Sequence, residues 1–313
     1  LESPTLKAGR EPSEQTLAAS MTRSASKQTY SIVRFLVDQE RVPEAYRAYA
    51  YFRWVDDRLD REVMEQAEGI AFINRQQQLL DCGYRDHWPD DLCVEERMLM
   101  HLVKSDREMN SGLQAYLRYM MAVMAFDASR RGWLISQPEL DEYTHLLARA
   151  VTVALHYFIG HDDASPHNEA RYLAASAAHI THMLRDTLED AAVGYYNIPR
   201  EYLYIHQIAP QEVDSQPYRA WVQSRVYLAR RYFKTGQDYL AQVQNLRCRM
   251  AGYLYMAHFE TVLAAIERDG YYLRPAYPEG KTIRTGIKMG WSLLSKALTR
   301  GRQELVSRPL PTR

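Results

Sequence analysis

Residues 46–80 read YRAYAYFRWVDDRLDREVMEQAEGIAFINRQQQLL, and they give the clearest helical pattern in the sequence. Apolar side chains recur in it at spacings of three and four residues, which is the period of an amphipathic helix. They are Tyr49, Phe52, Val55, Leu59 and Val63. No proline occurs between Pro43 and Pro89, so we expect the stretch to be helical without a proline break.

The helical pattern extends over most of the chain. Ser136-Gln137-Pro138-Glu139 reads as a capping box that opens a helix, and we expect further helices at about residues 169–193, 215–245 and 248–269. Gly194 and Pro199 indicate the end of the helix expected at about residues 169–193. Alternation typical of strands is almost absent. The pattern therefore predicts an all-α, single-domain protein of about eight to twelve helices.

The two ends of the chain are set apart from this domain. Residues 1–20 are polar and lack a sustained apolar period, so we expect a disordered tail or a non-native extension there. Residues 306–313 are expected to be a frayed tail. The predicted domain therefore spans residues 21–305.

Composition excludes several classes of protein. Lys plus Arg and Asp plus Glu both number 39, which argues against a nucleic-acid binder that relies on bulk positive charge. The three cysteines show no CxxC spacing, so neither a disulfide framework nor a zinc site is expected. No run of about 18 uncharged apolar residues is present. A reducing, cytoplasmic setting is the expectation.

Two pairs of aspartates stand out on helical stretches. Asp56 and Asp60 are one pair, and Asp186 and Asp190 are the other. A spacing of four residues places both carboxylates of a pair on one helix face, about 5–6 Å apart, where like charges repel. Oxygen ligands of this kind favour Mg²⁺. Spacing alone also allows an alternative to a metal site, in which the aspartates lie on solvated helix faces and nearby arginines neutralise their charge.

The surrounding residues resemble the squalene/phytoene synthase family. Tyr49-Ala-Tyr-Phe-Arg53-Trp-Val-Asp56-Asp57-Arg-Leu-Asp60 is similar to its first aspartate-rich motif, and Leu184-Arg185-Asp186-Thr-Leu-Glu189-Asp190 with Gly194 and Pro199 resembles its second. Weaker similarity covers Ser26-Lys27-Gln-Thr29-Tyr30, Ala125-Phe126-Asp127 and the segment 253–271. In family order the resemblance spans about residues 24–300.

The resemblance implies an isoprenoid-synthase-type helical bundle around a central cavity, and a prenyltransferase of squalene or carotenoid biosynthesis. Such enzymes join two farnesyl or geranylgeranyl diphosphates head to head, through a cyclopropyl diphosphate, into a C30 or C40 product. Two or three Mg²⁺ ions would be held by Asp56, Asp60, Asp186 and Asp190. Arg53, Tyr49, Arg185, Ser26, Lys27 and Thr29 would bind the diphosphates. NADPH is compatible with the family but is not indicated by any motif.

Several positions depart from the family pattern. His179 and His182 replace the Gln and Asn that precede the second motif, and His182 is either a ligand or hydrogen-bond partner in the site or a histidine packed between helices. Arg149 and Thr152 replace two glycines of V-A-G-x-V-G, which predicts a narrower or differently shaped cavity. The arginine and tyrosine after the second motif are Tyr195 and Asn197, and a later tyrosine is Phe259.

These departures leave two alternatives open. One is a terpene cyclase that uses the same metal site on a single prenyl diphosphate. The other is a non-catalytic relative that keeps the fold, against which the intact aspartate pairs argue.

Basic residues gather near the C-terminus, at residues 281–303, without an acid until Glu304. Apolar residues alternate with them, so we expect peripheral contact with an anionic inner membrane surface. The alternative is a C-terminal helix packed on the domain with a solvated basic face. Flotation of wild-type protein with liposomes, compared with a Lys/Arg→Glu variant of the segment, would separate the two.

Overall fold

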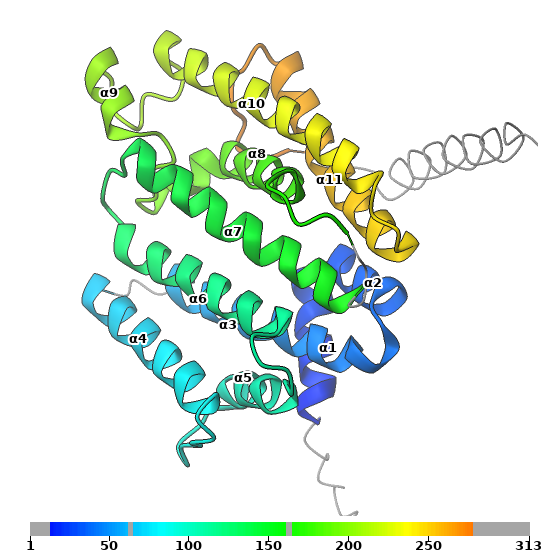
Figure 1. The fold of residues 1–313 in the computed structure, drawn as a ribbon. Helices are drawn as coiled ribbons and strands as arrows, with labels where there is room; N and C mark the ends of the chain where they lie inside the picture. The colour runs from blue at the N-terminus through cyan, green and yellow to red at the C-terminus, as the bar shows by residue number, and fades with distance from the viewer. Residues whose placement is uncertain (1–12, 62–64, 161–164, 278–313) are drawn as a thin grey trace, which may run out of the picture. The chain divides into compact units, whose positions relative to one another are not determined.

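A computed structural model describes residues 13–61, 65–160 and 165–277. Over these residues the chain forms eleven α-helices and one 3₁₀ helix (Figure 1). The only β pairing in the described part is an isolated bridge between Leu134 and Tyr196. The prediction of an all-α protein is confirmed. The basic segment 281–303, on which membrane contact was predicted, and the tail 306–313 lie outside the described residues.

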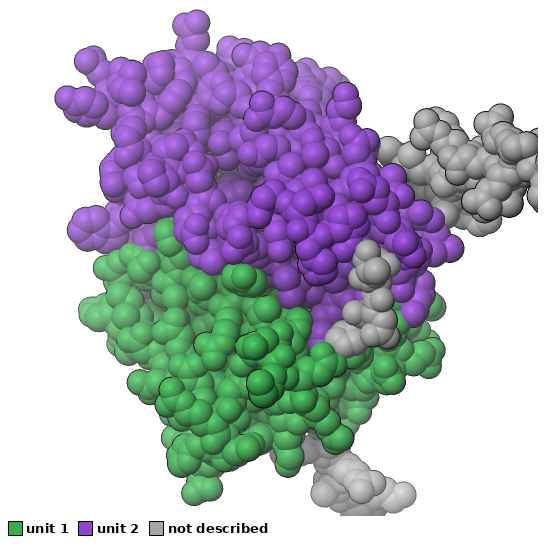
Figure 2. Space-filling view, viewed as in Figure 1, with its two compact units in different colours: residues 1–129 green, residues 130–313 purple. Residues whose placement is uncertain are grey.

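The chain divides into two compact units, residues 1–129 and 130–313, coloured green and purple in Figure 2. Helical periodicity gave no sign of this division, because it does not tell which helices contact each other. The helices of unit 1 are α1 (Glu14–Ala25), α2 (Lys27–Leu36), η1 (Gln39–Arg41), α3 (Val42–Arg61), α4 (Gln66–Gly83), α5 (Val94–Ser105) and α6 (Gly112–Arg130, whose last residue belongs to unit 2).

Helix α3 is the centre of unit 1 and packs against α1 and α5. Of the apolar positions predicted in this helix, Phe52, Val55 and Leu59 are buried, whereas Tyr49 is half-buried. Tyr51 donates a hydrogen bond to Gln76 Oε1 at 3.0 Å, inside the core. The stretch itself forms two helices, α3 and α4, rather than one.

Helix α1 corrects the predicted N-terminal boundary. Residues 14–20 were expected to be tail, but they lie in a helix that Ser13 caps by accepting a hydrogen bond from the Thr16 amide. Ala18 is fully buried, and Glu14 lies 2.8 Å from the Arg47 guanidinium of α3. A mostly polar helix is held by these long-range contacts, which local periodicity does not record.

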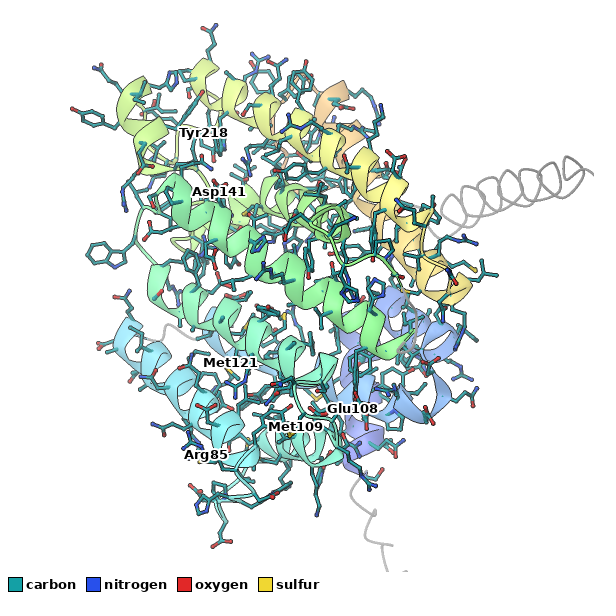
Figure 3. The ribbon with its side chains drawn as sticks, in the orientation of Figure 1. Arg85, Glu108, Met109, Met121, Asp141 and Tyr218 are labelled. Carbon is teal, nitrogen blue, oxygen red and sulfur yellow. The ribbon has the colours of Figure 1, made fainter. Side chains whose placement is uncertain are left out.

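Unit 2 contains α7 (Gln137–Phe158), α8 (Ala170–Ala192), α9 (Arg200–His206), α10 (Gln216–Leu240) and α11 (Leu246–Arg268). Helix α8 packs against α7, α10 and α11 (Figure 1). Its side chains from Ala175 to Leu184 are largely buried. The predicted capping box is present, with Ser136 and Glu139 bonded reciprocally. Figure 3 labels Asp141 on α7 and Tyr218 on α10.

None of the described helices is both long and apolar enough to cross a membrane.

Candidate active site

The first aspartate motif lies on the face of α3 beside its buried face. Phe52, Val55 and Leu59 are buried, and the 3.6-residue period places Arg53, Asp56 and Asp60 along the edge of that face. Asp60 is exposed and Asp56 is half-buried. The helix therefore holds the two carboxylates of the pair one turn apart, as the spacing predicted.

Arg53 pairs with two carboxylates of its own motif. Its Nη1 lies 3.1 Å from Asp56 Oδ2, and its Nη2 lies 2.6 Å from Asp57 Oδ1. The guanidinium side chain remains 41% exposed. Exposed pairs of this kind contribute little stability, so Arg53 can contact an incoming anion at small energetic cost.

Asp56 lies among other carboxylates. Burial is the main reason that the pKa of Asp56 is raised to about 7; the negative charges of Asp60, Asp57 and Asp127 of α6 contribute to the rise, and Arg53 opposes it. A carboxyl group in such surroundings resists ionisation unless a cation is added. This part of unit 1 is therefore suited to bind a cation.

The N-terminal patch meets the first motif at Tyr49. Ser26 caps α2 by accepting a hydrogen bond from the Thr29 amide at 3.1 Å. Burial is the largest influence on the pKa of the Tyr49 hydroxyl and raises it, while hydrogen bonds with the Ser26 and Thr29 side chains oppose the rise. Lys27 is exposed at the first position of α2. Unit 1 thus brings together Ser26, Thr29, Tyr49 and Arg53.

The second motif occupies one face of α8 in unit 2. Arg185 donates two hydrogen bonds to Asp186, from Nε to Oδ1 at 2.5 Å and from Nη2 to Oδ2 at 2.7 Å. His182 Nε2 lies 3.1 Å from Asp186 Oδ2. The carboxylate of Asp186 is therefore contacted by a guanidinium and an imidazole from its own helix.

Asp190, at the end of the same helix, is contacted by residues that follow the motif. Asn197 Nδ2 donates to Asp190 Oδ2 at 2.8 Å, and Arg130 Nη1 donates to Asn197 Oδ1 at 2.8 Å. The negative charge of Asp190 also adds to the effect of burial in raising the pKa of Tyr218. The second carboxylate of this pair is thus held in a polar environment different from that of Asp186.

The two histidines near the second motif lie in different surroundings. His182 is beside Asp186 and meets the ring of Phe259 edge to face at 6.5 Å, which favours the hydrogen-bond partner over a simple packing role. His179 is only 3% exposed, and burial lowers its pKa well below the usual value. Its ring packs edge to face on Tyr143 at 4.8 Å, so His179 belongs to the core.

Unit 2 contains two pockets that are partly open to solvent. The larger of the two has about 410 Å³ of empty space, and Thr152 and His156 are among its lining residues. The smaller, of about 260 Å³, is lined by Asn197, Tyr218 and Arg225 among others. Thr152, which replaces a family glycine, therefore contributes to the wall of the larger pocket. Arg149 instead lies over the Tyr172 ring at 5.7 Å.

The donor set fits Mg²⁺ in its chemistry. No group of three or more His, Cys, Asp or Glu side chains within the described ranges is arranged to hold a metal ion by itself. The carboxylates are nevertheless hard oxygen donors, and the crowding around Asp56 is relieved by a divalent cation. Each unit carries one pair, Asp56 and Asp60 in unit 1 and Asp186 and Asp190 in unit 2.

Three residues of this region were not predicted as site residues. Asp127 was noted only as part of a weak family similarity, yet its charge acts on Asp56. Arg130 and Asn197 gave no signal of contact, because they lie 67 positions apart in the chain. Only tertiary structure brings such residues together.

The described part of the chain is all-α and carries one pair of aspartates in each unit, and the comparisons with known proteins show the class of protein to which it belongs. The family model for squalene/phytoene synthase matches residues 22–281. The chain therefore belongs to the squalene/phytoene synthase family, whose members are prenyltransferases that join prenyl diphosphates head to head.

Solved structures share the fold at low sequence identity. Squalene synthase HpnC from Alicyclobacillus acidocaldarius is 18% identical, with a TM-score of 0.64, over 83% of this chain and 95% of that chain. A dehydrosqualene synthase in complex with ligand is 15% identical, with a TM-score of 0.64, over 90% and 97%. The complex of TcSQS with the ligand E5700 is 15% identical, with a TM-score of 0.66, over 88% and 85%. A comparison with curated proteins finds no match.

Proposed function

We propose that this protein catalyses the Mg²⁺-dependent, head-to-head condensation of two farnesyl or geranylgeranyl diphosphates. The product would be a C30 or C40 compound formed through a cyclopropyl diphosphate. The observation that supports the proposal is the partly buried position of Asp56 among other carboxylates; burial first, and then their negative charge, raises its pKa to about 7. The charged form of Asp56 is unfavourable here without a cation, and a bound cation would offset that cost.

The four paired aspartates are the proposed metal ligands: Asp56, Asp60, Asp186 and Asp190. Bound Mg²⁺ would neutralise the charge of a diphosphate and so make it a better leaving group. Asp186 is already oriented by Arg185 and His182, and Asp190 by Asn197. Two carboxylates whose positions are fixed in this way lose little conformational entropy when they bind a cation.

Arg53 and Arg185 are the proposed diphosphate-binding cations. A guanidinium presents several donors in a plane that matches phosphate oxygens. Arg53 is 41% exposed and Arg185 is 29% exposed, so both retain surface for an anion. Tyr49, Ser26 and Thr29 supply hydroxyl groups beside Arg53, and Lys27 adds a cation at the start of α2.

A terpene cyclase that acts on one prenyl diphosphate is the second candidate. Thr152 at the larger pocket and His182 beside Asp186 favour it, because both differ from the family pattern where the substrate is expected. The two reactions share the departure of diphosphate, so the metal site does not separate them.

Product analysis distinguishes the candidates. Purified protein is incubated with Mg²⁺ and farnesyl or geranylgeranyl diphosphate, with and without NADPH, and extracted with hexane. We expect a C30 or C40 hydrocarbon, or a cyclopropyl diphosphate in the aqueous phase. A C15 or C20 hydrocarbon would instead establish the cyclase, and absence of turnover with every substrate would contradict both reactions.

A further inference from the structure

The residues that follow the second motif in this chain differ from the family pattern. The family pattern has an arginine and a tyrosine after the motif, and Tyr195 and Asn197 occupy those positions here. Neither residue carries a charge, so this segment lacks the guanidinium of the family pattern. The structure shows another guanidinium at this place, supplied by Arg130.

A tight turn brings Asn197 back to Asp190. Gly194 adopts a φ of +91°, a conformation that other residues rarely take. The amides of Val193 and Tyr195 both donate to the Asp190 carbonyl, at 3.1 and 2.8 Å. The chain therefore reverses directly after α8, and the Asn197 amide reaches the carboxylate of Asp190 at 2.8 Å.

The segment before α7 runs alongside this turn. The Gly132 amide donates to the Gly194 carbonyl at 2.8 Å, and Leu134 forms a parallel bridge with Tyr196. A side chain at Gly194 would approach the Gly132 nitrogen to 3.3 Å, so glycine also permits the close contact of the two segments. This pairing fixes where Arg130 lies relative to Asn197.

Arg130 is enclosed rather than solvated. It is only 7% exposed, and its guanidinium lies 4.7 Å from the Tyr143 ring centroid and 5.0 Å from that of Tyr195. Aromatic faces attract a cation, more strongly where water is excluded. The tyrosine that replaces the family arginine therefore helps to hold an arginine from a different part of the chain.

The chemistry of the three groups allows only one order of hydrogen bonds. A guanidinium can only donate, and an ionised carboxylate can only accept. Asn197 must therefore turn Oδ1 toward Arg130 and Nδ2 toward Asp190. The structure has this orientation, with 2.8 Å between Arg130 Nη1 and Asn197 Oδ1 and 2.8 Å between Asn197 Nδ2 and Asp190 Oδ2. The carboxylate is thus linked to a buried positive charge through one amide.

We propose that Arg130, acting through Asn197, positions the carboxylate of Asp190 for cation binding and replaces the arginine and tyrosine that the second motif lacks. Both are positioning residues, since neither has to touch substrate. The inference rests on the proposed function, in which Asp190 is a metal ligand. Outer groups that orient a ligand typically change metal affinity by about 10–100-fold when removed.

The test measures the affinity for Mn²⁺, with inorganic pyrophosphate present, by electron paramagnetic resonance. Arg130→Met removes the charge at similar volume, and Asn197→Leu removes both hydrogen bonds. We expect each variant to bind Mn²⁺ about tenfold more weakly. The double variant should be no weaker than either single variant, because one chain of hydrogen bonds is broken in all three.

Controls separate this inference from the proposed function. Arg200→Met removes an arginine of the same unit that is 52% exposed and contacts Glu139, and it should bind Mn²⁺ as wild type does.

If Asp190→Asn leaves Mn²⁺ affinity unchanged, the metal assignment itself fails. If Asp190→Asn weakens binding while folded Arg130→Met and Asn197→Leu do not, or if their losses multiply in the double variant, the inference is overturned. Should Arg130→Met not fold, Asn197→Leu decides alone.

Discussion

Asp56 and Asp190 place the same functional group in opposite surroundings. Asp56 lies near the carboxylates of Asp57, Asp60 and Asp127, whereas Asp190 accepts a hydrogen bond from an amide that a buried arginine polarises. The first arrangement disfavours negative charge and the second favours it. Both residues are proposed metal ligands, each in its own unit, and burial and neighbouring carboxylates make the charged form of Asp56 unfavourable when no cation is present.

This contrast predicts a pH-dependent gain in stability for Asp56→Asn. The pKa of Asp56 rises from 3.8 to about 7 on folding, so between these values the folded state binds a proton that the unfolded state lacks. The free energy of unfolding therefore falls as pH rises through that window. With EDTA present, the variant should be more stable than wild type at pH 8, by about 1 kcal/mol after allowance for solvent screening, and equal near pH 4. Thermal unfolding measures this difference.

Asp57→Asn is the matched control for that measurement. It removes the neighbouring carboxylate, but also an ion pair of 2.6 Å with Arg53, so no comparable gain is expected at pH 8. An Asp56→Asn protein that is less stable than wild type at pH 8 would show that the crowding of charge around Asp56 is compensated.

At the residue scale, the sequence was informative where a motif is contiguous. Spacing correctly predicted that Asp56 and Asp60 share a helix face, and that Asp186 and Asp190 do. It could not show that Asp127 acts on Asp56 or that Arg130 reaches Asn197, because those contacts depend on how separate segments pack.

Helix packing in unit 2 depends on two glycines that face different neighbours. A Cβ at Gly236 of α10 would lie 2.8 Å from the Ala174 backbone nitrogen of α8. A Cβ at Gly252 of α11 would lie 2.7 Å from the Leu240 Cδ2 atom, at the flexible end of a side chain. Backbone cannot yield without moving a helix, but a leucine tip can rotate.

Substitution by alanine is therefore expected to lower the free energy of unfolding by different amounts at the two glycines. Gly236→Ala should destabilise the protein by about 2 kcal/mol, because overpacking outweighs the gain in helix propensity. Gly252→Ala should change stability by less than about 1 kcal/mol. Chemical denaturation of the two variants side by side measures this, and equal costs would contradict the close approach of α8 and α10.

At the element scale, helices with clear end signals were predicted well. The capping box at Ser136 and Glu139 opens α7, and Gly194 lies just past the end of α8 with a positive φ. Helix α1 was missed because its stability comes from Ala18 burial and the contact of Glu14 with Arg47. Those interactions leave no local period in the sequence.

At the scale of the molecule, each compact unit contributes one aspartate motif. Unit 1 adds Arg53 and Tyr49 to its pair, and unit 2 adds Arg185 and His182 to its own. The proposed reaction needs both motifs, because each pair is a proposed Mg²⁺ site and a diphosphate carries more negative charge than one Mg²⁺ ion would neutralise.

The rate of prenyl diphosphate consumption by wild-type, Asp56→Asn and Asp186→Asn proteins tests this requirement for both motifs most directly. The exposed Asp91→Asn, whose carboxylate is 75% exposed, serves as the control, and circular dichroism confirms folding. We predict that each motif variant loses activity by roughly a thousandfold, while Asp91→Asn keeps it. A folded variant of either motif that consumes substrate at nearly the wild-type rate would contradict the proposed metal site.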